Sequence, residues 1–512
     1  MATAGSGIVG FVSEGVSDDP RVANSTALIC NGEERSYGDL ALAIDTMRHV
    51  VARRCGLGAV VAVIGDTSIE FIETVLGVIA AGAVVLPLSP QYPLAERQRA
   101  CSLAEPALVI TLPDLAAAEQ EACAALGREH LAWADYAIAS AAIQGPGEPD
   151  ASVDSVAIDP DSPALLLFTS GTAGKPRLAE LTHSNVEASI RSTIDHSAEL
   201  GEAADVVLGV MPLTHVLGLV TVLGVSLALK ATLVLVPQPT VESVVAAVDE
   251  RQVTLLVAPP VFWHRLAAAS PDAKALASVK LAISGAAPLS GSLAKQVTAT
   301  VGLTLRQGYG LTEASPALTS SVGLAAPATS VGRPVPGVEL RLVDEFGDDA
   351  LIGDVGEVWA RGANIFAGYR GDPAATANVL DPQGWLRTGD LAVVDDKGYL
   401  YIVGRSKDQI ICSGFNVHPT EVEERLLSDD RVQAVAVVGA PDREFGEVVV
   451  AWIVPSVAMI DEAEQRSLLA AELRDHCRVS LAGYKVPSRF EFVDELPRGL
   501  GGKLRRRALR SP

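Results

Sequence analysis

The chain alternates short apolar runs with stretches of helical period over most of its length. A Val/Ile run without a helical period is typical of a buried strand, whereas apolar residues three and four positions apart are typical of an amphipathic helix. The first such unit is a strand between Gly58 and Gly65, a helix from Thr67, a break at Gly82 and a second strand at 83–88. Strand, helix and strand in this order predict a parallel α/β unit.

The same alternation continues toward residue 284 and predicts further α/β units. A helical pattern opens at Ser36–Leu40, and an apolar run that ends at Phe168 suits a buried strand. The later strands are expected at Val206–His215, Thr232–Val236, Thr254–Ala258 and Lys280–Ser284, and the helices at Val216–Leu229, Val241–Arg251 and around Phe262-Trp263. Val216–Leu229 is apolar but too short for a membrane span, so we expect a buried helix there.

The C-terminal part has a different pattern. Gly356–Tyr369 alternates as a strand does, and two short strands at 432–438 and 448–454 precede an amphipathic helix at Glu464–Arg478. This is an α+β pattern. The stretch Gly145–Pro163, rich in Pro, Asp, Gly and Ser, reads as a linker. A chain of 512 residues exceeds one hydrophobic core, so two or more domains are expected.

Composition narrows the classes of function. The hydrophobic share of 49% supports a sizeable core, and the net charge of -22 repels nucleic acid and anionic membranes. The six cysteines (Cys30, Cys55, Cys101, Cys123, Cys412 and Cys477) lack paired metal-ligand spacing. The first residues contain no basic segment followed by an apolar core, so we expect no secretory signal. Together these features predict a cytoplasmic protein with reduced thiols, without a membrane span and without a nucleic-acid partner.

The segment Leu165–Asn185 carries the first candidate chemistry. A polar loop, Thr169 to Lys175, follows the predicted strand and ends before Pro176. Its two glycines let backbone N–H groups turn into one concavity, and its three hydroxyls and lysine supply further donors for a polyphosphate. It is not the common P-loop, because Gly171 and Gly174 are too close together. An ordinary polar loop after a strand is the alternative.

Two further segments contain residues suited to a nucleotide. Gln307–Glu313 (QGYGLTE) combines flanking glycines with an aromatic face for a base, a threonine donor, and a carboxylate that suits magnesium. Asp390, in the sequence Thr388-Gly389-Asp390, offers a carboxylate able to accept hydrogen bonds from both hydroxyls of a ribose. A hairpin with a structural acid and a turn aspartate are the respective alternatives.

The order of these segments resembles that of the adenylate-forming enzymes, which include acyl-CoA synthetases, aryl-CoA ligases, luciferases and peptide-synthetase adenylation domains. The resemblance extends from about Ser36 to Lys503 and includes the signature loop, QGYGLTE, TGD, GRSKD and GGK. The chain departs from the family at Arg177-Leu178, where Lys-Gly is usual, and at 411–413, where many relatives have a lysine.

The resemblance implies a fold and a reaction. The fold is a large N-terminal domain of αβ-layered sheets with a small barrel, residues 1–404, and a smaller α+β lid domain, residues 405–512. In the implied reaction a carboxylic acid attacks the α-phosphate of ATP and expels pyrophosphate, and the thiol of coenzyme A then attacks the acyl adenylate to give a thioester. Magnesium is the implied metal.

The resemblance also assigns roles to individual residues. Lys503 is the catalytic lysine of the lid, Lys407 the hinge, Gly414 part of the thiol channel, and His215 a residue at the border of the acyl pocket. Thr312 contacts the α-phosphate and Glu313 holds the metal. The remaining ATP-binding residues are Thr169, Ser170, Gly171, Thr172, Gly174, Lys175, Gly285, Ala286, Gly308, Tyr309, Gly310, Asp390 and Arg405.

Three alternatives remain open from the sequence. The acyl group is transferred to the pantetheine of a carrier protein instead of coenzyme A, or the chain is an amino-acid adenylation domain, or it is a non-catalytic nucleotide- or acyl-binding homologue. The second would require a carboxylate near His215 to pair the substrate ammonium, and none is nearby in the sequence. The low aromatic content of 4% favours an aliphatic or alicyclic acid. A homodimer is also left open.

Overall fold

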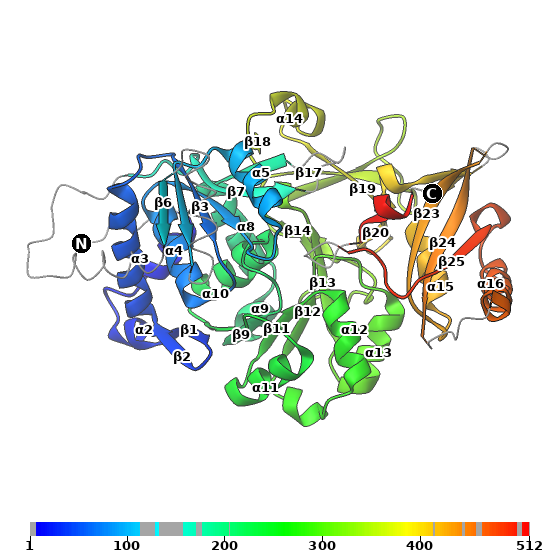
Figure 1. Cartoon of the computed structure of the whole chain (residues 1–512), viewed down its shortest axis with the longest axis horizontal. Helices are drawn as coiled ribbons and strands as arrows, with labels where there is room; N and C mark the ends of the chain where they lie inside the picture. The colour runs from blue at the N-terminus through cyan, green and yellow to red at the C-terminus, as the bar shows by residue number, and fades with distance from the viewer. Residues whose placement is uncertain are drawn as a thin grey trace, which may run out of the picture.

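The computed structural model describes residues 7–112, 129–132, 157–169, 177–203, 205–412, 415–442, 446–456, 463–498 and 504–510. The described strands form four sheets. Two large sheets make up the N-terminal part, a smaller antiparallel sheet follows, and the last sheet lies at the C-terminal end of the molecule (Figure 1). Among the described residues, no helix is long and apolar enough to cross a membrane.

The seven-stranded sheet contains the first predicted α/β unit. Its order is β18 (Gly368–Tyr369), β8 (Arg177–Thr182), β7 (Pro163–Thr169), β4 (Val84–Leu88), β3 (Val60–Ile64), β5 (Leu108–Thr111) and β6 (Glu129–Ala132). Strands β3 and β4 pair in parallel, and helix α4 (Ile69–Ala80) connects them. Gly82 makes the turn into β4 with a φ of 71°, a value that glycine adopts without strain. The predicted strand–helix–strand unit is confirmed.

The nine-stranded sheet contains the other predicted units. Its order is β15 (Arg333–Pro334), β14 (Ala317–Ser320), β13 (Leu305–Gly310), β12 (Leu281–Ser284), β11 (Leu255–Ala258), β9 (Val206–Gly209), β10 (Thr232–Leu235), β1 (Thr26–Cys30) and β2 (Glu33–Ser36). The six central strands, β1, β10, β9, β11, β12 and β13, are parallel to one another. Their carboxyl ends therefore meet along one edge of the sheet, which is where α/β proteins bind ligands.

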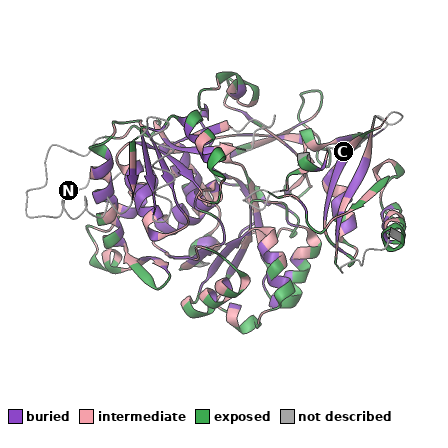
Figure 2. Cartoon of the chain, viewed as in Figure 1, coloured by how far each residue is buried: buried purple, intermediate pink, exposed green. Residues whose placement is uncertain are grey.

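Side chains of the nine-stranded sheet alternate between two cores. Val207 and Val257 belong to the large core shared with the seven-stranded sheet, whereas Leu208 and Leu256 belong to a second core with Trp263. This alternation follows from the two-residue period of a strand. Helices α11 (Val241–Arg251), α12 (Pro260–Ala269) and α13 (Gly291–Val301) cover the second core (Figure 1). Figure 2 shows the strands buried and the outer sides of these helices exposed.

Two sequence predictions near residue 210 need correction. The strand expected at Val206–His215 ends at Gly209, because Pro212 follows and the carbonyl of Pro212 accepts a hydrogen bond from the His215 N–H in a turn. The helix expected at Val216–Leu229 is present and buried, but its first part is a π-helix, η1 (Leu217–Gly224), that continues into α10 (Val225–Ala228). Such π-helical segments are rare and frequently occur at functional sites.

The remaining helices are mostly short. In the N-terminal part they are α1 (Ile8–Ser13), α2 (Pro20–Asn24), α3 (Tyr37–Ala52), α5 (Leu94–Ala104), α8 (His183–Asp195), α9 (Ala198–Ala203), η2 (Ala273–Leu276), η3 (Thr312–Ala314) and α14 (Pro373–Val379). Near the C-terminus they are η4 (Ser406–Asp408), α15 (Pro419–Leu427), α16 (Ala463–Arg478), η5 (Gly483–Lys485) and η6 (Arg506–Leu509). Helix α3 begins where its sequence predicts, because Ser36 and Asp39 form a reciprocal capping box.

The last two sheets are antiparallel, apart from a parallel pair of strands in the C-terminal sheet. Strands β16 (Val338–Val343), β17 (Gly356–Gly362), β19 (Leu386–Val394) and β20 (Leu400–Arg405) form a four-stranded sheet in the region where the sequence predicts a small barrel. The C-terminal sheet contains β21 (Ile410–Cys412), β22 (Phe415–Val417), β23 (Val432–Asp442), β24 (Gly446–Pro455) and β25 (Arg489–Phe492). Two hydrophobic clusters built only from residues 410–509 pack against this last sheet. The boundary at 404/405 stays a prediction.

Glu73 provides a test of the N-terminal core. It lies on α4, is 6% exposed, and accepts a hydrogen bond from the Arg35 side chain. Burial raises its pKa from 4.5 to about 7, an effect that Arg35 only partly offsets. The folded state therefore binds this proton more tightly than the unfolded state does. As a result, the free energy of unfolding falls as pH rises from 4.5 to about 7.

We predict that Glu73→Gln removes this pH dependence, which amounts to about 3 kcal/mol at most. Urea unfolding at several pH values between 5 and 8 measures it. Glu345→Gln, at an exposed position, is the matched control. A wild-type curve with no loss of stability over this range would contradict the prediction.

Candidate active site

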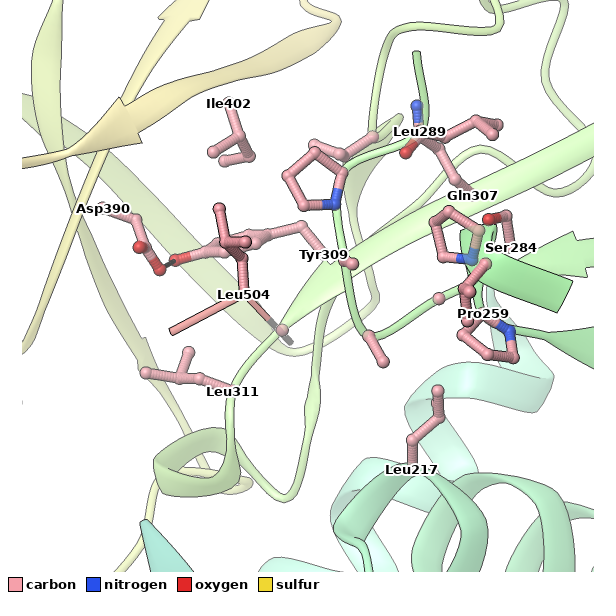
Figure 3. A pocket seen from close by; sticks show the side chains of 18 of the residues that line it. Leu217, Pro259, Ser284, Leu289, Gln307, Tyr309, Leu311, Asp390, Ile402 and Leu504 are labelled. Carbon is pink, nitrogen blue, oxygen red and sulfur yellow. Dashed lines mark hydrogen bonds between the residues drawn. The ribbon is translucent and has the colours of Figure 1, made fainter. Parts of the chain in front are cut away.

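A cleft of about 2540 Å³ lies between the carboxyl ends of β12 and β13, the four-stranded sheet, and the C-terminal sheet with α15. Part of it is drawn in Figure 3. All the sequence-predicted site residues that the structure describes line this cleft. They are Thr169, His215, Gly285, Ala286, Gly308, Tyr309, Gly310, Thr312, Glu313, Asp390, Arg405 and Lys407. Residues that are far apart in the sequence are therefore brought to one cavity by the fold.

Asp390 is held at the centre of the cleft by two partners. Its Oδ2 accepts a hydrogen bond from the Tyr309 hydroxyl at 2.8 Å (Figure 3). Its Oδ1 pairs with Nε of Arg405 at 2.8 Å. Arg405 is in register with Asp390 across β19 and β20, whereas Tyr309 comes from β13. Since a carboxylate has about four acceptor positions, two partners leave it capable of accepting hydrogen bonds from a ligand.

Tyr309 stays neutral at this position. Burial is the main cause that raises the pKa of its hydroxyl well above the ordinary value, and the neighbouring Asp390 carboxylate adds to it. The hydroxyl therefore remains a hydrogen-bond donor, and the ring is held in one orientation. Behind it, Gly310 leaves no room for a side chain, because a Cβ there would lie 1.9 Å from the Pro316 carbonyl oxygen.

Glu313 has a partner that sequence reasoning missed. The hydroxyl of Tyr369 donates to Oε1 of Glu313 at 2.8 Å. The guanidinium of Arg177 lies 5.4 Å from the centre of the Tyr369 ring, and its Nε is 3.3 Å from Oδ2 of Asp372. Arg177 is the basic residue directly after the predicted phosphate loop. The alternating stretch that ends at Tyr369 does not indicate this contact, because it joins two residues 56 positions apart in the sequence.

The described residues fit a magnesium site to which the protein supplies few of the metal ligands. They contain no cluster of three or more His, Cys, Asp or Glu side chains that could hold a metal by themselves. Magnesium usually keeps several waters and binds through one or two carboxylates together with substrate phosphates. One oriented carboxylate at Glu313, beside the end of the phosphate loop, is a suitable donor set.

Two buried hydroxyls in the cleft lack a partner among the described residues. They are the Oγ1 of Thr169, at the end of β7, and the Oγ of Ser284, at the end of β12. Ser284 is 1% exposed and was not predicted as a site residue. Buried polar atoms are nearly always hydrogen-bonded, so an unpaired pair at one cleft indicates a place for ligand atoms.

His215 is oriented by the chain that follows it. Its Nδ1 accepts a hydrogen bond from the Leu217 N–H at 3.2 Å, so the proton of a neutral ring lies on Nε2. Leu217 is in turn fixed above Gly285, where a Cβ would approach its Cδ2 to 2.8 Å. Figure 3 shows Leu217 pointing from its helix toward Pro259 and Ser284.

Seven predicted site residues lie outside the described residues. They are Ser170, Gly171, Thr172, Gly174, Lys175, Gly414 and Lys503. Leu504, the residue after Lys503, projects into the part of the cleft that Tyr309 and Leu311 line (Figure 3). Lys407 lies in the short helix η4, and its carbonyl oxygen accepts a hydrogen bond from Arg510. Among the described residues 410–412 and 415–417, which flank Gly414, none lines the cleft.

Comparisons with known proteins agree with the geometry of the cleft. The family model described as AMP-binding enzyme matches residues 19–370, and the one described as AMP-binding enzyme C-terminal domain matches residues 421–503. A feruloyl-CoA synthase from Amycolatopsis sp is 32% identical over 94% of this chain and 94% of its own length. A long-chain-fatty-acid–CoA ligase from Yersinia pestis is 35% identical over 68% of this chain, which corresponds to 61% of that ligase.

Solved structures give the same result. The ATP-bound crystal structure of MatB from Rhodopseudomonas palustris has a TM-score of 0.87 and 29% identity, and the match covers 98% of both chains. The predicted fold class, a large α/β domain with a smaller C-terminal domain, is confirmed by this agreement. The chain belongs to the AMP-binding enzyme family of adenylate-forming enzymes and is an AMP-forming acid–thiol ligase.

Proposed function

We propose that this single cleft carries out both half-reactions of the ligase, with the residue roles given below. In the first, a carboxylate oxygen bonds to the α-phosphorus of ATP and the bond to the β-phosphate breaks, releasing pyrophosphate. In the second, the sulfur of coenzyme A bonds to the acyl carbon and AMP leaves. The main support is Asp390, a buried carboxylate held between Tyr309 and Arg405 at the carboxyl ends of the parallel strands.

Tyr309, Asp390 and Arg405 form the proposed nucleoside site. The Tyr309 ring stacks on adenine, beside the backbone of Gly285 and Ala286. The free acceptor positions of Asp390 receive the ribose hydroxyls, and Arg405 holds the carboxylate in place from its other side. Because Tyr309 and Arg405 are already paired with Asp390, the site needs little rearrangement when the nucleotide binds.

The phosphates are proposed to lie between the loop of Thr169 to Lys175 and the segment of Thr312 and Glu313. Lys175 and the loop hydroxyls bind the leaving phosphates, and Thr312 donates to the α-phosphate. Glu313 binds magnesium, which when present neutralises the phosphate oxygens. Tyr369 holds the Glu313 carboxylate in place through its hydroxyl, and Arg177 stacks on the Tyr369 ring. We propose that this arrangement directs the carboxylate toward the phosphates.

The acyl end of the reaction is proposed to lie near His215. The Nε2–H of its neutral ring donates a hydrogen bond near the substrate carboxylate, while its Nδ1 remains occupied by the Leu217 N–H. Lys503, adjacent to Leu504 in the cleft, bridges the carboxylate and the α-phosphate during adenylation. Charge accumulates there in the transition state, and fixed donors stabilise it.

The second half-reaction requires a different arrangement of the C-terminal domain, residues 405–512. Leu504 occupies the cleft while none of the described residues beside Gly414 lines it, so the described conformation suits adenylation. We propose that the domain rotates at Lys407 to withdraw Lys503 and bring Gly414 to the thiol channel. Lys407 is exposed, at the junction of the four-stranded and C-terminal sheets.

The remaining proposals concern the thiol that accepts the acyl group, the oligomeric state and the cellular location. The acid and coenzyme A are the substrates; a carrier-protein pantetheine is the alternative acceptor, and a thioester assay with both acceptors distinguishes them. The non-catalytic alternative is disfavoured by the complete set of described site residues on one cleft. A cytoplasmic location agrees with the described cysteines Cys30, Cys55, Cys101, Cys412 and Cys477, which are not in disulfides. A homodimer stays a hypothesis.

The proposed role of Lys503 predicts a large effect of its removal. Lys503→Ala should lower the rate of acyl-adenylate formation by about 10²–10³ while ATP binding and the fold are retained, because one preorganised donor is lost. Pyrophosphate release measures the rate, and the exposed Lys397→Ala serves as the control. Adenylation within threefold of wild type would remove Lys503 from the mechanism.

The ribose role of Asp390 predicts selective loss of affinity. Asp390→Asn should weaken ATP about tenfold or more, but 2′-deoxy-ATP by less, because the deoxynucleotide lacks one of the two hydroxyls. Calorimetric titration of both nucleotides tests this. Tyr309→Phe, which leaves the carboxylate in place, should produce a smaller difference between them. Equal losses for the two nucleotides would make Asp390 a purely structural residue.

The hinge proposal predicts that the two half-reactions separate. Lys407 lies in a 3₁₀ turn, whose φ range proline also adopts, so Lys407→Pro should retain the described conformation and adenylate formation. Locking φ should strongly slow thioester formation from preformed acyl-AMP. Rapid-quench assays with ATP alone and then with acyl-AMP plus thiol time each step. A wild-type rate in the second assay would exclude a pivot at this residue.

A further inference from the structure

Beyond His215 the cleft continues inward between η1/α10 and the nine-stranded sheet. We call this part the inner slot and define it by ten lining residues. One wall is the helix, with Leu217, Thr221, Val222 and Val225; the other is the sheet, with Val207, Leu255, Val257 and Ile283. Thr193 and Leu200 complete the set. The slot is continuous with the cleft at Leu217, beside Gly285.

The sequence explains why these residues face one another. Val207, Leu255, Val257 and Ile283 lie on alternate positions of β9, β11 and β12 and share one face of the sheet. Leu217, Thr221, Val222 and Val225 recur at helical spacing and form one stripe of η1 and α10. The two stripes therefore run alongside each other away from the reactive end.

Two glycines set the distance between the walls. A Cβ on Gly285 would lie 2.8 Å from Cδ2 of Leu217, and a Cβ on Gly209 would lie 2.7 Å from Cγ1 of Val222. The helix therefore rests on backbone at both points. A side chain at either position would clash with Leu217 or Val222, so both glycines allow the helix to pack this close to the sheet.

The chemistry of the lining is uniform. The ten residues include no charged side chain and no aromatic ring, and their only polar groups are the hydroxyls of Thr193 and Thr221. Ser226, beside Val225, adds a third hydroxyl to the lining, and this hydroxyl donates a hydrogen bond to the Val222 carbonyl. A second charge on the substrate would be desolvated without a partner there, which is strongly unfavourable. A ring would find no aromatic partner at the usual stacking distance. A flexible hydrocarbon tail, by contrast, gains from the apolar walls along its whole length.

We propose that the preferred acid of this ligase is an aliphatic carboxylic acid with a medium or long hydrocarbon tail and no second charge. The tail fills the inner slot, and Thr221 and Val225 determine how long it is. The stripe from Leu217 to Val225 covers about 12 Å at most, or two helical turns. This inference rests on the adenylation proposed above for the adjoining cleft.

The first test compares acids on the wild-type enzyme. Pyrophosphate release is measured with acetate, butanoate, hexanoate, octanoate, decanoate and dodecanoate, and also with adipate and cinnamate. We expect kcat/KM to rise about fourfold per added methylene, equivalent to about 0.8 kcal/mol, until the slot is full. A flat series, or a preference for adipate or cinnamate, overturns the inference about the tail. No adenylation with any acid would instead overturn the proposed function.

The second test moves the end of the slot. Thr221→Phe and Val225→Phe place a ring at the middle and at the far end, so the longest accepted acid should be shorter for Thr221→Phe than for Val225→Phe. Val225→Phe should lower kcat/KM for dodecanoate at least a hundredfold more than for butanoate. The control is Val220→Ile, a fully buried residue on the same helix that does not line the slot. Thermal melts identify variants that fail to fold.

If a phenylalanine variant does not fold, Val225→Ala replaces it. The smaller side chain lengthens the slot, so the optimum should move to a longer acid than the wild type prefers. Chain-length profiles that are identical for wild type, the filled variants and Val225→Ala would show that the tail binds elsewhere, and the inference would be wrong.

Discussion

The buried Asp390 carboxylate is the interaction on which the rest of the site depends. A charge with 4% exposure is strongly unfavourable unless it is paired and hydrogen-bonded. Its two partners come from different sheets: Tyr309 from the nine-stranded sheet and Arg405 from the end of the four-stranded sheet. The need to satisfy one carboxylate therefore holds two sheets in register at the point where the nucleotide is proposed to bind. Arg405 is also the last residue before η4, so the same pair fixes the position from which the C-terminal part of the chain departs.

A second node connects the remaining sheet to the same cleft. Tyr369 belongs to β18, at the edge of the seven-stranded sheet, and bonds to Glu313 next to the end of β13. Arg177 stacks on the same ring and starts β8, directly after the phosphate loop. In this way the seven-stranded sheet also contributes a side chain to the polar contacts of the cleft. Arg177, at the start of β8, therefore supports Tyr369, the hydrogen-bond partner of Glu313.

The sequence predicted those elements whose local signals agree with their burial. Helix α11 has the predicted bounds, because Thr240 and Ser243 cap its start and the stretch has a clear helical period. The strand at 206–215 was predicted too long, because apolar residues continue past the point where Pro212 ends the pairing. The π-helical turn of η1 has no signal in a period analysis. Tyr369 and Ser284 were missed as site residues, because a contact between distant strands and an unpaired hydroxyl exist only after folding. The roles of Lys175, Gly414 and Lys503 rest on the sequence resemblance alone.

In the proposed mechanism, the division of the site between two parts of the chain lets the enzyme retain a reactive intermediate while the C-terminal domain rotates. The described groups proposed to bind the acyl adenylate, namely the inner slot, His215, Tyr309 and Asp390, all precede residue 404. The groups that differ between the two half-reactions, Lys503 and Gly414, both follow it.

Withdrawal of the C-terminal domain then removes only interactions needed in the adenylation transition state. Interactions present in both the ground and transition states do not accelerate the chemistry, but they keep the intermediate bound. An apolar tail in the slot is suited to that task. The tail stays buried in the slot when pyrophosphate leaves, and its burial does not depend on the protonation of any group. Arg177 and Arg405 are paired with protein carboxylates, and the proposed catalytic cation is delivered on the mobile part, where it acts in one step and is then removed.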